Sequence, residues 1–333
     1  MLRGSRLRRP ALFLAVTALT AGLSACGGDV VTAGEPAAEG LDAVTISGDV
    51  GKAPQVEFSE RMDADGVETE TLVEGDGAEV EDGDWIEANV ASYNGFDGQQ
   101  ISTTYGKGGG GAQVLQISAE DPRFEGLIGT TIGSRVVVVG TSNDFFGQDG
   151  LGGTQLGVGN TDSVLYVVDV MREAEVTEGP DWFPTIISGK GDPQFLDFTE
   201  TPEPSGELQV ETLTEGDGRP VTEGDDVRIN YLGQTATGPG PFDENYTQPE
   251  PQPSPVTQFV PGFTQAIVGQ RIGSRVVVAI PPDLGYGEAG NPQAGITGTD
   301  TLYFVIDVLG AAPSQAGGQG GAGGDGAGDA APQ

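Results

Sequence analysis

The hydrophobic pattern in the C-terminal half of the chain predicts β-strands separated by turns. Residues 208–213 alternate Leu, Val and Leu with polar residues, and residues 227–232 alternate Val, Ile and Tyr with polar ones, as strands with one buried face do. Residues 275–280 and 301–309 are rich in β-branched residues and almost continuously apolar, which is typical of central strands. Turns containing Gly and Pro separate these runs, so the pattern indicates an antiparallel sheet.

One short helix is predicted between these strands, from Pro261 to about Val268. Pro261 suits the first turn of a helix, Phe263 and Ile267 share one helical face, and Gly269 provides an end. A sheet of antiparallel strands with one helix lying across it is an α+β unit. We therefore predict the α+β class.

The same unit occurs twice in the chain. Its clearest anchor is the sequence IGSRVVV, found at residues 132–138 and again at 272–278. A second anchor, EGDG, occurs at 74–77 and at 215–218, so the offset is 140 residues at the first anchor and 141 at the second. A period this long predicts two globular domains rather than a solenoid.

Composition outside the two copies predicts flexible segments. The segment that joins the copies contains Trp182, Phe183 and Pro184, which are apolar for a linker, so we expect it to pack against one domain. The predicted organisation is a lipoprotein signal peptide with a lipobox (1–26), a flexible tether (27–48), a first domain (49–174), a linker (175–187), a second domain (188–312) and a disordered Gly/Ala-rich tail (313–333).

The first residues predict export and a lipid anchor. Four arginines precede an apolar run at 11–23 that is too short to span a bilayer, which is the layout of a secretory signal. The run ends in LSACG, which resembles the bacterial lipobox, where the cysteine, here Cys26, is lipidated and becomes the N-terminus. Two or more acyl chains hold a protein on a membrane. Because the signal also predicts export, we expect the protein to be lipid-anchored on the extracytoplasmic face of the cell membrane. The alternative is an ordinary signal peptide cut near Ala25.

Composition excludes several classes of partner and site. The formal net charge is −35, and loss of the four signal arginines takes it to −39, which argues against nucleic acid as a partner. The single cysteine excludes a disulfide within the chain. The absence of histidine removes Ser-His-Asp and Cys-His catalysis, and zinc sites with histidine ligands.

Six short motifs follow one another in the second copy. They are VRINYLG at 227–233, FD at 242–243, FVPGF at 259–263, VGQR at 268–271, IPPDLGYG at 280–287 and TLYF at 301–304. In this order and spacing they resemble the FKBP-type peptidyl-prolyl isomerase family, over residues 206–310. The resemblance implies FKBP-like domains, each a bent antiparallel sheet wrapped on one short helix with a hydrophobic pocket between them.

The resemblance also implies a set of site residues, without a metal or a cofactor. The expected catalytic residues are Tyr231, Asp243, Phe263 and Tyr286, and the expected substrate-binding residues are Phe242, Phe259, Val260, Ile296 and Phe304. The Val260 N–H and the Tyr286 hydroxyl match groups that hydrogen-bond ligand carbonyls, and Asp243 matches an acid against the Tyr231 hydroxyl. Taken singly, the aromatic residues on the strands and the helix are equally well explained as core packing.

The implied reaction suits a chain without histidine. Rotation of an X-Pro bond crosses a barrier of about 18–20 kcal/mol but needs no proton transfer, metal or nucleophile. A water-poor aromatic pocket favours the twisted amide, which has less charge separation than the planar one. We therefore expect an exported, membrane-anchored, monomeric isomerase that acts on proline-containing, unfolded or partly folded polypeptides. The alternatives are a non-catalytic peptide-binding or holdase lipoprotein that uses the same groove, and a structural envelope lipoprotein.

Residues 247–255 depart from the family pattern. This stretch is rich in proline where family members usually have a basic segment. Repeated proline cannot serve a central ladder, so we expect a stiff extended loop in place of an edge strand.

The first copy differs at the expected site positions. Val90 matches Tyr231, Ile101 and Ser102 match Phe242 and Asp243, Arg123 matches Phe263, Phe146 matches Tyr286, and Tyr166 matches Phe304. With the acid, two hydroxyls and the aromatic floor replaced, we expect the first copy to be a degenerate domain without isomerase activity. The alternative is that Phe124, rather than Arg123, provides the floor of the pocket.

Overall fold

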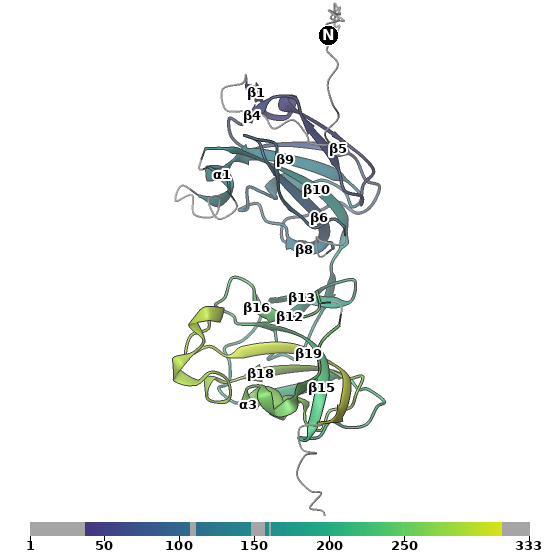
Figure 1. Ribbon diagram of the computed structural model, residues 1–333, viewed down its shortest axis with the longest axis vertical. Helices are drawn as coiled ribbons and strands as arrows, with labels where there is room; N and C mark the ends of the chain where they lie inside the picture. Colours follow the sequence, from purple (N-terminus) through teal and green to yellow (C-terminus); the bar gives the residue numbers. More distant parts are fainter. Residues whose placement is uncertain (1–36, 107–110, 148–156, 160, 249, 315–333) are drawn as a thin grey trace, which may run out of the picture. The chain divides into compact units, whose positions relative to one another are not determined.

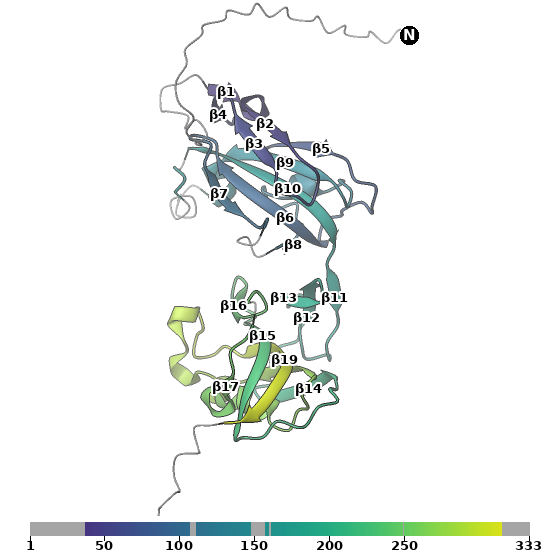
Figure 2. The same cartoon turned by 45° about the vertical axis from the view of Figure 1, so that its right-hand side comes forward.

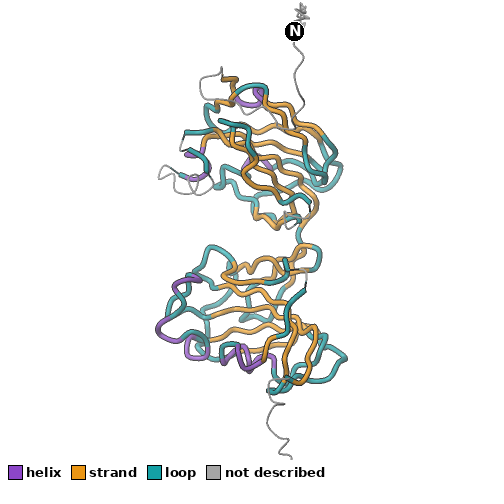
Figure 3. Tube along the Cα trace, viewed as in Figure 1, coloured by secondary structure: helices purple, strands orange, loops and turns teal. Residues whose placement is uncertain are grey.

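The structure is a computed structural model that describes residues 37–106, 111–147, 157–159, 161–248 and 250–314. Cys26, the signal segment, the first part of the expected tether and most of the expected tail lie outside the described residues. No helix among the described residues is long and apolar enough to cross a membrane. Figure 3 shows that strands are the main regular structure of the described residues, with a few short helices, as expected of FKBP-like units.

Each copy of the repeat builds a six-stranded antiparallel sheet, and the two sheets have the same strand order (Figures 1 and 2). The first sheet runs β5 (Glu68–Val73), β9 (Arg135–Thr141), β10 (Ser163–Glu173), β6 (Trp85–Asn94) and β7 (Gln100–Thr103), and β8 (Gln113–Gln116) pairs with β6. The second sheet runs β14 (Gln209–Thr214), β18 (Arg275–Ile280), β19 (Leu302–Pro313), β15 (Asp225–Gln234) and β16 (Pro241–Glu244), and β17 (Ser254–Pro255) pairs with β15. The four strands expected from the hydrophobic pattern are β14, β15, β18 and β19.

The predicted helix of the second copy is α3 (Pro261–Ile267). Pro261 occupies its first turn, and Gly269, with a φ of 91°, lies just beyond its end, where only glycine adopts this backbone conformation without strain. The helix buries Phe263, Ala266 and Ile267 against the inner face of the second sheet. At the corresponding place the first copy has only the 3-10 helix η2 (Glu125–Leu127), and a short helix α1 (Ser142–Phe146) follows β9.

The outer face of each sheet is covered by a hairpin that precedes it. The hairpin of β2 (Val44–Ser47) and β3 (Gln55–Phe58) packs with the outer residues of β9 and β10. The hairpin of β12 (Thr185–Gly189) and β13 (Asp192–Asp197) packs on the second sheet, and β11 (Glu175–Thr177) pairs with β12. Phe183 is buried in this contact, in agreement with the apolar composition of the joining segment.

The hairpins lie partly in segments expected to be a tether and a linker. Residues 37–48 form β1 (Ala37–Glu39), the 3-10 helix η1 (Gly40–Ala43) and β2, and β1 pairs in parallel with β4 (Arg61–Asp63). Residues 175–187 contain β11 and the start of β12. The reason is visible in the sequence, since Val44, Ile46 and Ile186 supply apolar side chains to the clusters on the outer faces. These residues belong to the packed part of the chain.

The arginine within each IGSRVVV anchor helps to hold the hairpin in place. Arg135 is almost fully buried, pairs with Asp169 at 2.6 Å, and donates to the carbonyls of Gly48, Asp49 and Lys52 in the first hairpin. A buried ion pair is tolerated when hydrogen bonds satisfy its remaining donors, as they do here. In the second copy Arg275 pairs with Asp307 at 2.7 Å and donates to a carbonyl of the second hairpin. The repeated arginine is therefore explained by packing and hydrogen bonding.

Candidate functional site

Five aromatic residues meet on the inner face of the second sheet, and we call them the aromatic cluster: Tyr231, Phe242, Phe259, Phe263 and Phe304. Phe304 lies at its centre, with its ring edge-on to Phe263 at 5.1 Å and to Phe242 at 5.5 Å between centroids. Phe259 stacks on Phe263 at 4.8 Å. Phe263 and Phe304 are buried, and the other three rings are only partly buried. The cluster therefore has a closed base and a partly exposed apolar surface.

The strand register explains why these side chains meet. Tyr231 pairs with Ile306, and Gly233 pairs with Phe304, so alternate residues of β15 and β19 point to the same inner face. A Cβ at position 233 would collide with the rings of Phe304 and Phe242, so the glycine provides the space in which they meet. This glycine is a residue that the reasoning from sequence did not single out, although it stands within the VRINYLG motif.

The Tyr231 hydroxyl donates a hydrogen bond to the Asp243 carboxylate at 2.8 Å. Burial, followed by this hydrogen bond, raises the pKa of Tyr231 above its ordinary value, and the charges of Asp243, Tyr286 and Glu244 act in the same direction. The hydroxyl therefore stays protonated through the neutral and weakly alkaline range. Asp243 itself is exposed, so the pair lies at the solvent edge of the aromatic cluster.

A side chain that sequence reasoning missed positions Tyr231. Beyond Glu244, strand β16 ends, and the Asn245 side chain takes over the pairing with β15. Its Oδ1 accepts from the Tyr231 N–H at 2.7 Å, and its Nδ2 donates to the Ile229 carbonyl at 2.9 Å. Asn245 is buried, and a buried amide with two such bonds fixes the backbone under Tyr231. Its signal in the sequence is weak, because an asparagine after a strand is most often a turn residue.

The remaining expected site residues surround the aromatic cluster. Val260 caps the start of α3, and among the described residues no group accepts a hydrogen bond from its N–H. Ile296 is buried in the same hydrophobic core. Tyr286 lies between two short 3-10 turns, η4 (Pro282–Leu284) and η5 (Gly287–Ala289), and is 41 % exposed. The Val260 N–H and the Tyr286 hydroxyl are thus polar groups at the rim of an apolar surface.

The proline-rich segment forms a short strand at its end. Its last two residues are β17, which pairs with Asp226 and Val227 of β15. The rest of the described part of 247–255 is turn or irregular structure. A loop with one short pairing therefore follows β16, and its β17 lies at the edge of the sheet, where proline is tolerated.

The register of the first sheet allows the two copies to be compared at each position. Val90 pairs with Val168 as Tyr231 pairs with Ile306, and Ser102 pairs with Ser92 as Asp243 pairs with Gly233. The hydroxyls of Ser92 and Ser102 lie 2.7 Å apart and hydrogen-bond each other. The first copy thus lacks the tyrosine and the acid, as the comparison of the sequences indicated.

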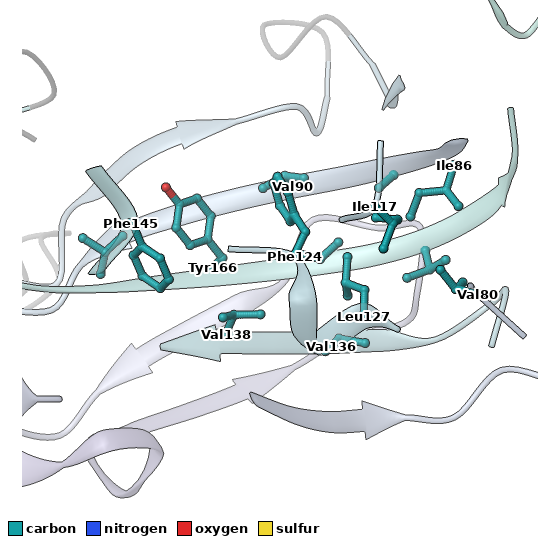
Figure 4. Close-up of a cluster of buried hydrophobic side chains, with 14 of the residues drawn as sticks. Val80, Ile86, Val90, Ile117, Phe124, Leu127, Val136, Val138, Phe145 and Tyr166 are labelled. Carbon is teal, nitrogen blue, oxygen red and sulfur yellow. The ribbon is translucent and has the colours of Figure 1, made fainter. Parts of the chain in front are cut away.

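The prediction that Arg123 occupies the position of Phe263 in the first copy was wrong. Phe124, not Arg123, packs edge-on against Tyr166, at 6.5 Å between centroids, as Phe263 does against Phe304 (Figure 4). Arg123 instead pairs with Asp121 at 2.6 Å and places its guanidinium 5.2 Å above the Phe124 ring. The aromatic floor is therefore retained, as the alternative assignment allowed, and a cation covers it. The sequence comparison missed this because the first copy has the short 3-10 helix η2 where the second copy has α3, so residue positions in the two segments do not correspond one to one.

The space around Tyr166 is filled by a further ring. Phe145 of α1 packs edge-on against Tyr166 at 5.2 Å, on the side away from Phe124 (Figure 4). Phe124, Phe145 and Tyr166 are 8 %, 7 % and 9 % exposed. The neighbouring Phe146, expected at the position of Tyr286, is half-buried against the same core. Phe124, Phe145 and Tyr166 therefore form a closed core on the inner face of the first sheet.

The chemistry available at the aromatic cluster is binding and desolvation. The described residues contain no group of three or more Cys, Asp or Glu side chains placed to hold a metal ion. The cluster offers an apolar surface for a ring, one tyrosine hydroxyl held by a carboxylate, and a backbone N–H. This set suits a ligand that carries a carbonyl group next to an apolar ring.

Comparison with known proteins identifies this part of the chain. Residues 217–309 match the family described as FKBP-type peptidyl-prolyl cis-trans isomerase. The chain is 33 % identical over 107 residues to the isomerase FkpA of Escherichia coli, which covers 32 % of this chain and 38 % of FkpA. It is 29 % identical over 109 residues to an FK506-binding protein of Streptomyces anulatus, covering 32 % of this chain and 88 % of that protein. Residues 217–309 are therefore an FKBP-type domain.

Other matches cover a similar part of the chain. The 22 kDa FKBP-type isomerase of Escherichia coli is 33 % identical over 102 residues, which is 31 % of this chain and 48 % of that protein. The chain thus spans less than half the length of the two Escherichia coli relatives. The crystal structure of Escherichia coli FkpA aligns with a TM-score of 0.30 at 32 % identity, over 34 % of this chain and 51 % of that chain.

Proposed function

We propose that this chain is a peptidyl-prolyl cis-trans isomerase whose site is the aromatic cluster of the second copy. The observation that carries the proposal is the arrangement around Tyr231. Its hydroxyl is held by Asp243 at 2.8 Å, and its ring is edge-on to both Phe263 and Phe304, at 6.0 and 6.2 Å between centroids. The match of residues 217–309 to the isomerase family supports the same site.

The geometry accounts for the reaction without acid–base chemistry. A proline ring placed on Phe263 and Phe304 removes apolar area from water, which contributes about 25 cal/mol per Å². The amide that precedes the ring then lies in a water-poor place, where the twisted form is favoured over the planar one because it is less polar. The Val260 N–H and the Tyr286 hydroxyl are the donors that can hold the carbonyls while the bond turns. No step transfers a proton.

The isomerase is proposed to act outside the cytoplasm on proline-containing, unfolded or partly folded polypeptides. The support for export and anchoring is the sequence LSACG after the apolar run at 11–23. Changing Cys26 to Ser is expected to release the protein from the membrane fraction or to leave an unprocessed precursor. Wild-type protein found only in soluble fractions would contradict the anchor, and it would leave the isomerase proposal unaffected.

The activity is tested by the rate of cis/trans exchange in a Leu-Pro peptide, with and without the full chain. Uncatalysed exchange takes tens to hundreds of seconds at 25 °C, so acceleration is measured directly by NMR or by a protease-coupled assay. We expect acceleration by the wild-type chain. Saturable binding of the peptide without any acceleration would instead support the non-catalytic binding protein.

A further inference from the structure

The negative charge beside the aromatic cluster has no cationic partner among the described residues. Asp243 is exposed, accepts the hydrogen bond of Tyr231, and takes part in no ion pair among them. The sequence also has no Lys or Arg at residues 229–270 or after Arg275. All five residues of the aromatic cluster lie within these two stretches, which contain no Lys or Arg. The site is therefore built without a basic residue.

Three of the four arginines of the second copy are held by other groups, and the fourth, Arg228, pairs with Gly310 on β19, six residues beyond Phe304. Arg219 pairs with the Asp225 carboxylate at 2.8 Å, and Arg275 pairs with Asp307 at 2.7 Å on the outer face of the sheet. Arg271 lies 3.5 Å from Glu215 and donates to the Gly218 carbonyl. These three arginines are thus held by groups outside the aromatic cluster.

Further acidic residues stand on the segments that border the aromatic cluster. Asp283 and Glu288 flank Tyr286 in the sequence, and both are exposed. Glu244 follows Asp243 on β16, and its carboxylate accepts hydrogen bonds from the N–H and the hydroxyl of Thr247. With no neighbouring cation, these charges add to the negative potential that a peptide meets at the rim.

We propose that the site selects prolines that have Lys or Arg as a direct neighbour in the polypeptide. The inference rests on the proposed isomerase function and names its substrate class. A proline seated on Phe263 and Phe304 brings the neighbouring side chain beside Tyr231, whose hydroxyl is 2.8 Å from Asp243. A lysine or arginine there gains the attraction of the unpaired carboxylate, and an acidic residue is repelled by it.

The size of the effect follows from the exposure of Asp243. Ion pairs at an exposed site are weak, so a preference of about three- to fivefold in kcat/KM is expected for a single cation. Attraction at an exposed site is screened by salt, because the Debye length falls from about 10 Å at 0.1 M to about 3 Å at 1 M ionic strength. The preference is therefore expected to vanish in concentrated salt.

The test uses the full chain and pairs of peptides that differ only in charge. One pair carries lysine or Nε-acetyl-lysine before proline, and a second pair carries them after proline. Exchange rates at low salt and at about 1 M NaCl give the ratio of kcat/KM within each pair. We expect the lysine peptide to be favoured about three- to fivefold at low salt in at least one pair, and equal rates at high salt.

Two variants assign the preference to the site. Asp243→Asn is expected to remove most of it, and because the ratio is taken on one enzyme, a general loss of activity cancels. Asp217→Asn is the matched control, since it removes an exposed charge from the turn packed against Ile272 and Gly273, at the end of β18 away from the aromatic cluster. It should leave the ratio unchanged.

The outcomes separate this inference from the proposed function. Acceleration of both peptides of each pair with equal kcat/KM at low salt would overturn the inference and leave the isomerase intact. No acceleration of any peptide would overturn the proposed function. A preference that persists at high salt, or that Asp217→Asn reduces as much as Asp243→Asn, would also contradict the role of Asp243.

Discussion

The two copies of the repeat build the same sheet and differ at the residues that line its inner face. Both have the same strand order, and both place two rings edge-on at the floor, Phe124 with Tyr166 and Phe263 with Phe304. Only the second copy adds Tyr231, on β15, and its hydrogen bond to an acid on β16. A fold and its aromatic floor can therefore persist where the polar part of the site is absent.

The second difference lies around the floor, because the floor rings themselves are buried in both copies: Phe124 and Tyr166 are 8 % and 9 % exposed, and Phe263 and Phe304 are 3 % and 6 % exposed. In the first copy Phe145 packs against Tyr166, and Arg123 lies over Phe124. In the second copy a seven-residue helix supports the floor from one side, and the rings at its rim are only partly buried. The first copy therefore covers its floor with Phe145 and Arg123, whereas the second copy surrounds its floor with partly exposed aromatic rings.

The largest expected effect comes from truncating the floor in each copy. Phe263→Ala and Phe124→Ala each remove a buried ring, so each should lower the free energy of unfolding by about 3–5 kcal/mol. Isomerase activity should fall at least about tenfold in Phe263→Ala, because the floor becomes open to water, and stay near wild type in Phe124→Ala. Urea unfolding and peptide exchange are measured on the same samples.

A milder variant guards against loss of the fold. Phe263→Leu keeps an apolar side chain at the floor but removes the aromatic surface, and it should reduce activity while circular dichroism remains native. Equal loss of activity on truncating Phe124 and Phe263 would show that both copies catalyse, and the contrast between them would fail.

A smaller effect is expected from removing the tyrosine hydroxyl at the rim. Tyr231→Phe loses the hydrogen bond to Asp243, worth about 0.5–1.5 kcal/mol, and should lower activity severalfold. Tyr246→Phe is a matched control on the opposite face of the sheet, where its hydroxyl donates to Asp307 at 3.0 Å. It should cost similar stability and leave activity unchanged. If Tyr246→Phe lowered the exchange rate and Tyr231→Phe did not, the site would lie on the outer face of the sheet.

The smallest expected effect is that of pH on catalysis. The chain has no histidine, and burial together with Asp243 raises the pKa of Tyr231, so the rate should be nearly constant from about pH 6 to 9. The raised pKa means that the folded state favours the protonated tyrosine. Its stabilising contribution is complete below the ordinary tyrosine pKa of about 10 and is lost as pH rises further.

This alkaline loss is measurable by unfolding experiments. The free energy of unfolding of the wild type should fall more steeply above about pH 10 than that of Tyr231→Phe, which lacks the group. A bell-shaped rate profile near neutral pH would instead indicate acid–base catalysis and contradict desolvation as the main cause of the acceleration.

Much of the second copy was predictable from the sequence because its signals are local. Alternation located the strands, and Pro261 and Gly269 marked the ends of α3. Asn245 was not predictable, because its role depends on β16 ending beside the backbone of Tyr231. The two hairpins were missed because they contact the sheets through residues distant in the sequence, as Arg135 does with Gly48. Phe124 was misassigned because a short 3-10 turn replaces the helix.

The most direct test is to give the second copy the residues of the first in the full chain. The double variant Tyr231→Val, Asp243→Ser places valine and serine at the rim, the residues that the first copy has at the corresponding positions, Val90 and Ser102. Circular dichroism and urea unfolding confirm that the variant is folded, and NMR exchange on a Leu-Pro peptide gives its activity. The account predicts exchange close to the spontaneous rate. A folded variant with wild-type acceleration would contradict it, because the rim of the second copy would then not distinguish an active site from a closed core.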